Sequence, residues 1–108
     1  MLEVKDDGEL KKLLASNKKL LALFFASWCP YARAFRPIFE GEAGKVEGCR
    51  CAIAVVDEDE NPLWDMCAVE RVPTVIYFKD GKISKKLVET PGVGLNRKEL
   101  LDFLKLLG

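Results

Sequence analysis

Residues 20–32, Leu-Leu-Ala-Leu-Phe-Phe-Ala-Ser-Trp-Cys-Pro-Tyr-Ala, decide the fold predicted for this chain. The segment begins with an apolar run of the length of a buried strand and ends in Trp-Cys-Pro, where proline favours the first turn of a helix. Cys29 is therefore predicted to lie between a buried strand and a helix N-terminus. The free backbone N–H groups and the dipole of such a helix favour a thiolate, which predicts a reactive sulfur.

The length, composition and net charge of the chain limit the classes of protein to which it can belong. With 108 residues, 49% of them apolar, residues 1–108 are predicted to form a single domain with a substantial core. Seventeen basic and 17 acidic residues give a net charge of zero, which argues against binding to nucleic acid or to an anionic membrane. No apolar run has the length of a membrane span, and the layout of a signal peptide is missing at the start. We therefore expect a cytoplasmic protein.

The chain has no histidine and four cysteines, so histidine-based catalysis and histidine metal sites are excluded. Cys29, Cys49, Cys51 and Cys67 do not form two C-x-x-C pairs, and we expect neither a metal nor a cofactor. Cys49 and Cys51 should point the same way, and because a disulfide between them would be strained, they are predicted to be reduced and structural. Cys67 is predicted to pack in the core. The acidic run at residues 57–60 could bind a hard cation, but a solvated loop is favoured.

Hydrophobic periodicity predicts the element order β-α-β-α-β-α-β-β-α. The expected strands cover residues 2–4, 20–26, 51–56, 75–78 and 83–89. The expected helices run from residue 7 or 8 to 16, from 30 to about 44, briefly from 62, and after an Asn96 cap with Glu99 in a capping box. The early β-α-β units predict parallel strands, and Asp80-Gly81 predicts an antiparallel hairpin at the polar last strand.

At this point the chain resembles the thioredoxin family over essentially its whole length. The resemblance is carried by residues 24–30, Pro37, residues 72–74, residues 78–81 and Gly94. Each motif is weak alone, but their order and spacing agree with the strand and helix order above. The resemblance implies a thioredoxin-like α/β fold, with a central mixed β-sheet and helices on both faces. Cys29-Pro30-Tyr31 also resembles the start of the glutaredoxin motif, although the rest of the chain is closer to thioredoxin.

The resemblance also implies roles for individual residues. Cys29 would be the nucleophile, and Pro73 would follow a cis peptide bond beside it. The residues implied in substrate binding are Trp28, Pro30, Tyr31, Val72, Pro73, Val93 and Gly94. Two of these have alternatives that the sequence leaves open: Pro73 could be an ordinary proline at the start of a strand, and Trp28 could simply pack in the core.

Three positions depart from the family pattern. Ala32 stands where the resolving cysteine is expected, so no second thiol is available there to release a mixed disulfide. Leu23 replaces a buried carboxylate, and Ile53 replaces the lysine that would partner it. Losing both charges together is physically consistent, because a lone buried lysine would be costly. Ala32 could be natural or an engineered substitution that traps a mixed disulfide.

These observations give two hypotheses for the function. The first is a redox protein of cell redox homeostasis: a thiol–disulfide oxidoreductase or isomerase-like enzyme that forms mixed disulfides through Cys29 alone. Its expected partners are disulfide-containing proteins and a reductase or glutathione, and it is expected to be a monomer. The alternative is a non-catalytic adaptor with the same fold, which holds extended peptides beside Pro73.

Overall fold

Strand β2 (Lys19–Phe25) lies at the centre of a five-stranded sheet in the computed structural model, which describes residues 1–108. The strands follow one another across the sheet in the order β1-β3-β2-β4-β5. The other four strands are β1 (Leu2–Val4), β3 (Arg50–Val55), β4 (Thr74–Lys79) and β5 (Lys82–Val88). All five predicted strands are present, with ends that differ from the prediction by one residue or less.

The sheet is mixed, as predicted. Strands β1, β3 and β2 are parallel, whereas β4 pairs antiparallel with both β2 and β5. In this register Leu23 lies beside Ile53 of β3 on one side and beside Val75 of β4 on the other. Strand β5 is the polar edge strand that the sequence predicts, and most of its side chains are exposed.

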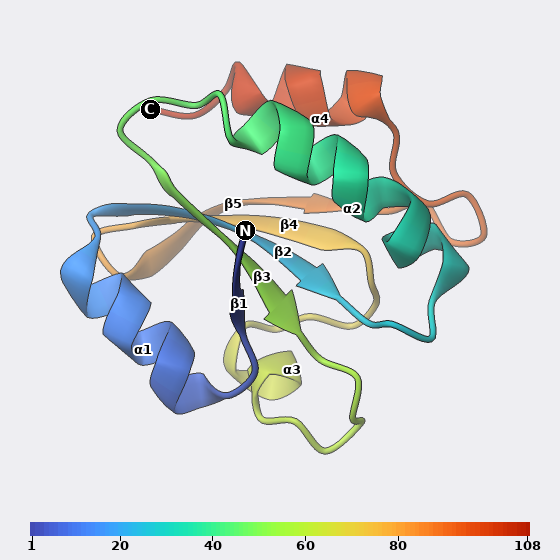
Figure 1. Cartoon of the computed structure of the whole chain (residues 1–108), viewed down its shortest axis with the longest axis horizontal. Coiled ribbons are helices and arrows are strands. Elements are labelled where there is room, and N and C mark those ends of the chain that lie inside the picture. Colours follow the sequence, from blue (N-terminus) through green and yellow to red (C-terminus); the bar gives the residue numbers. More distant parts are fainter.

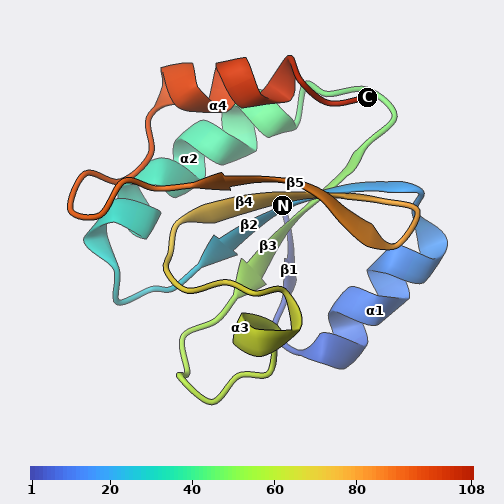
Figure 2. The ribbon, with the colours of Figure 1, turned by 180° about the vertical axis from the view of Figure 1, so that it is seen from behind.

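Helices cover both faces of the sheet, which confirms the predicted architecture (Figures 1 and 2). Helices α2 (Pro30–Ala43) and α4 (Arg97–Leu104) lie side by side on one face. Helices α1 (Asp7–Ser16) and the short α3 (Leu63–Met66) lie on the other. No helix combines the length and the apolar character that crossing a bilayer requires.

The central strand is buried on both of its faces, which explains its unbroken apolar sequence. All residues from 20 to 25 are buried, and Phe35 and Phe39 of α2 pack into the same core. Their rings lie 6.5 Å apart between centroids in a tilted arrangement. The core therefore fixes the end of β2, and with it the start of α2.

Local signals in the sequence form the structures that they predict. Asn96 and Glu99 make the reciprocal capping box at the start of α4. Asp80 and Gly81, with φ of 53° and 79°, form the two-residue loop between β4 and β5. Both residues adopt positive φ, as a type I′ hairpin turn requires.

Candidate active site around Cys29

Cys29 is the N-cap residue of α2, with Pro30 at the first helical position. Its backbone N–H donates to the Ala26 carbonyl at 3.1 Å, and its own carbonyl accepts from the Arg33 N–H at 3.0 Å. The residue is only 7% exposed. The structure thus places the thiol at the junction of β2 and a helix N-terminus, as the sequence predicts.

The Val72–Pro73 peptide bond is cis, which confirms the prediction for this proline. The Cys29 thiol faces this segment and donates to the Val72 carbonyl, with 3.6 Å between sulfur and oxygen. Both Val72 and Pro73 are buried, and β4 begins directly after them at Thr74. The structure therefore brings Cys29, Val72 and Pro73 together from positions more than 40 residues apart in the sequence.

Trp28 lies on the surface, so the alternative of a core tryptophan is wrong. Its side chain is 55% exposed, and its Nε1–H donates to the Asp57 carbonyl at 2.8 Å. The carboxylate of Asp57 accepts two further bonds, from the Ser27 N–H and the Ser27 hydroxyl, each 2.7 Å long. Asp57 therefore connects the loop after β3 to the loop that carries Cys29.

Short sequence patterns do not predict this role of Asp57, because the acidic run at residues 57–60 favours a solvated loop. A signal for it exists in the sheet register, because β2 and β3 are parallel and Phe25 pairs with Val55. Ser27 and Asp57 come two residues after this pair, so both lie just beyond the carboxyl ends of neighbouring parallel strands. The other acidic residues of the run at 58–60 are exposed, and no group of three or more potential metal ligands is found.

Tyr31 contacts the loop between β5 and α4, which lies beside the start of α2 (Figures 1 and 2). Its hydroxyl donates to the Gly92 carbonyl at 2.8 Å. Gly94 has φ of +81°, and a Cβ placed there would lie 2.9 Å from Cδ1 of Tyr31. Val93, between these glycines, is 66% exposed. The loop therefore needs glycine at 94 to lie so close to the Tyr31 ring.

The three positions that depart from the family pattern are all fully buried. Ala32 lies in the first turn of α2, three residues after Cys29, and presents a methyl group. Leu23 and Ile53 are register neighbours on β2 and β3, as predicted, and fill the interior with aliphatic atoms.

All four cysteines are free. Cys67 is buried, and that burial raises the pKa of its thiol to about 11, so it stays protonated near neutral pH. Cys49 and Cys51 lie at the start of β3, whereas Cys29 follows the end of the parallel strand β2. The seven residues of β2 span roughly 23 Å, so these thiols lie at opposite ends of the sheet from Cys29.

Comparison with known proteins agrees with this geometry. The family model described as Thioredoxin matches residues 2–105. The chain is 31% identical to a thioredoxin of Mycoplasmoides gallisepticum over 105 residues, covering 97% of this chain and 100% of that one. It is 35% identical to a thioredoxin of Mycolicibacterium smegmatis, covering 94% and 92% of the two chains. The structure of Fasciola hepatica thioredoxin superposes with a TM-score of 0.82 at 27% identity and covers 97% of each chain. This chain therefore belongs to the thioredoxin family of thiol–disulfide oxidoreductases.

Proposed function

We propose that this protein exchanges disulfides through Cys29 alone and holds its substrate as a mixed disulfide until a thiol from outside the site releases it. The observation that carries the proposal is the pairing of a cysteine at the N-terminus of α2 with a buried methyl group at Ala32. The first feature supports attack on a disulfide. The second leaves no sulfur one helical turn away to complete the reaction.

In the first step the Cys29 thiolate attacks one sulfur of a substrate disulfide. A bond forms between Cys29 and that sulfur, and the other substrate sulfur leaves as a thiolate. In the second step another thiolate attacks the mixed disulfide and expels Cys29. When this thiolate belongs to the substrate, the net result is isomerisation, and when it belongs to glutathione, the substrate is transferred to the small thiol.

The proposed substrates are proteins with extended disulfide-bearing segments, with a reductase or glutathione as the second partner. The substrate would lie along Val72 and Pro73 beside the sulfur. The exposed ring of Trp28 and the exposed side chain of Val93 offer apolar contacts on either side. The other residues proposed for this surface are Pro30, Tyr31 and Gly94.

The alternative function is that of an adaptor, which binds an extended peptide at the same surface without exchange. One observation favours it: Cys29 is only 7% exposed and its thiol contacts the Val72 carbonyl, so the sulfur is enclosed by the protein rather than open to a substrate. In that case the Val72 carbonyl would belong to a peptide-binding surface, and Cys29 would form no adduct.

The test is to mix the protein with an excess of a peptide disulfide and follow the adduct by intact-mass spectrometry, with peptide mapping of the modified cysteine. The parent should form an adduct at Cys29 that persists. The Ala32→Cys variant should release it, because the new thiol lies one turn away. It should also reduce protein disulfides with turnover, although slowly, because Leu23 cannot accept the proton.

The matched control is Ala32→Ser, which adds a polar atom of similar size but no thiol, and should keep the adduct as the parent does. A parent that clears its adduct without added thiol would show that another cysteine resolves it, and would overturn the single-cysteine mechanism. A parent that forms no adduct even at alkaline pH would support the adaptor.

A further inference from the structure

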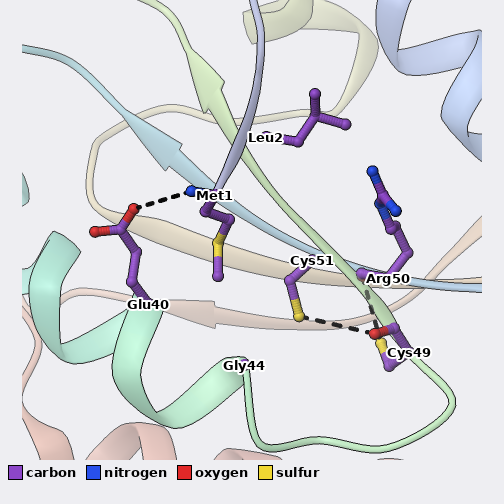
Figure 3. A pocket seen from close by; sticks show the side chains of 7 residues that line it. All are labelled: Met1, Leu2, Glu40, Gly44, Cys49, Arg50 and Cys51. Carbon is purple, nitrogen blue, oxygen red and sulfur yellow. Dashed lines mark hydrogen bonds and ion pairs between the residues drawn. The ribbon is translucent and has the colours of Figure 1, made fainter.

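A second pair of thiols lies at the end of the sheet opposite Cys29. Cys49 directly precedes β3, and Cys51 is the second residue of that strand. Both are half-buried, and the Cys51 sulfur lies 3.9 Å from the Cys49 carbonyl and 3.3 Å from the Ala43 carbonyl at the end of α2. Figure 3 shows the two side chains on the wall of one depression of about 510 Å³.

The two thiols differ in how readily they ionise. The neighbouring Cys51 thiol, and then the positive charge of Lys19, lower the pKa of Cys49 against the opposing effect of partial burial. The neighbouring Cys49 thiol, and then partial burial, raise the pKa of Cys51 far above its usual value. Cys49 is thus the sulfur of the pair that more readily becomes a thiolate, and Cys51 stays protonated. In a dithiol exchange site, one thiol attacks the substrate disulfide as a thiolate and the other later resolves the mixed disulfide.

Cys49 also borders a second depression, of about 480 Å³. Lys18, Lys19 and Arg50 line it, and none of the lining residues carries a carboxylate. A small disulfide with carboxylate groups could place these groups on the three cations while its sulfur atoms reach Cys49. The surroundings of Cys49 therefore favour a partner that carries both a disulfide and negative charge.

We propose that Cys49 and Cys51 form a second thiol–disulfide exchange site, which takes small carboxylate-bearing disulfides such as glutathione disulfide and works independently of Cys29. The Cys49 thiolate attacks glutathione disulfide, forms a mixed disulfide and expels one glutathione thiolate. In the mixed disulfide Cys49 is no longer a free thiol that opposes ionisation of Cys51. Cys51 then passes its proton to the expelled glutathione thiolate and attacks the Cys49 sulfur, and the second glutathione leaves as a thiolate. The protein dithiol is oxidised to the Cys49–Cys51 disulfide, and one glutathione disulfide is reduced to two glutathione molecules.

The chain geometry allows this disulfide to close. Two residues of extended chain span at most about 7 Å between Cα atoms, close to the upper end of the range that disulfides bridge. Cys49 lies outside β3 and follows Gly48, whose φ of +74° marks a turn, so the shortening can occur without breaking the sheet. A closed ring this small is strained, and strained disulfides are easily reduced again. The pair is therefore expected to alternate between the dithiol and the disulfide rather than to stabilise the fold as a permanent disulfide.

The experiment uses the full chain with Cys29→Ser, so that failure of the Cys29 mechanism cannot affect the outcome. After addition of glutathione disulfide, intact-mass spectrometry should show a transient glutathione adduct and then loss of two hydrogens, mapped to Cys49 and Cys51. Adding Cys51→Ser should stop the reaction at the Cys49 adduct. Adding Cys49→Ser instead should slow adduct formation at least about tenfold, because only the thiolate attacks.

The charge selectivity is tested with Lys18→Gln, which removes a cation of the second depression that is not among the causes of the low Cys49 pKa. It should slow reaction with glutathione disulfide about two- to fivefold but leave reaction with the neutral hydroxyethyl disulfide unchanged. Lys5→Gln is the matched control and should change neither rate, because Lys5 follows the carboxyl end of β1, at the other end of the parallel strands, and lines neither depression. A persistent adduct on Cys51 or Cys67, no oxidised pair, or equal effects of Lys18→Gln on both disulfides would overturn the proposal. Circular dichroism of each variant confirms that it is folded.

Discussion

Leu23→Asp places a carboxyl group at the centre of the sheet without the lysine that would partner it, because Ile53 occupies the lysine position. Leu23 is fully buried and lies between Ile53 and Val75, which are also fully buried and aliphatic. A carboxyl placed there has no charged partner, so the native state should keep it protonated and its pKa should rise far above the unfolded value. Keeping it protonated costs about 4 kcal/mol at pH 7 and about 1.5 kcal/mol at pH 5.

The matched control is Leu23→Asn, which has nearly the same shape but does not titrate. Losing the leucine and burying a neutral polar group, a carboxyl in one variant and an amide in the other, should cost each variant roughly 3–5 kcal/mol, a large share of the 5–15 kcal/mol typical of a domain. Above about pH 4 the folded Leu23→Asp protein binds more protons than its unfolded chain, so its stability falls as pH rises. The gap between the two variants should widen by about 1.4 kcal/mol per pH unit.

The assay is urea denaturation followed by far-ultraviolet circular dichroism between pH 5 and pH 7. Leu23→Asp should be measurably folded at pH 5 and largely unfolded at pH 7, whereas Leu23→Asn should change little across this range. The double variant Leu23→Asp/Ile53→Lys should recover part of the loss at pH 7, because it supplies the missing partner. If both single variants show the same pH dependence, the carboxyl reaches water and the packing described around Leu23 is wrong.

Two further predictions concern the surroundings of the site and the buried Cys67. Asp57→Ala should lower the free energy of unfolding by about 1–2 kcal/mol, because Ser27 loses two bonds to a carboxylate; thermal denaturation measures this, and Asp59→Ala, in the same exposed run, should have little effect. Burial raises the pKa of Cys67 from 9.0 to about 11, so the native state keeps a proton that the unfolded chain loses. The free energy of unfolding in urea should therefore fall as pH rises from about 9 towards 11, and this fall should be smaller in Cys67→Ala than in the parent.

The strands and helices of this chain could be predicted because their signals are local. The apolar run of β2, the capping residues Asn96 and Glu99 and the Asp80-Gly81 turn each act within a few residues. The cis bond before Pro73 was predictable only through the family resemblance. The bonds from Ser27 to Asp57 depend on the register of two parallel strands, which no short sequence pattern encodes. The cationic surroundings of Cys49 could not be predicted for the same reason, because Lys18 and Lys19 come from the start of β2, which the register places beside the start of β3.

The bonds between Asp57 and the loop after β2 determine when the loop that carries Cys29 loses its conformational freedom: during folding or during the reaction. A disulfide exchange needs the attacking, central and leaving sulfur atoms nearly in line, so a mobile nucleophile would lose freedom at the moment of reaction. Here the Ser27 backbone, the Ser27 hydroxyl and the Trp28 indole are all held by one residue at the end of β3, and this freedom is already lost when the sheet forms. Loosening β3 should therefore change the activation entropy of attack by Cys29 rather than the nucleophilicity of its sulfur.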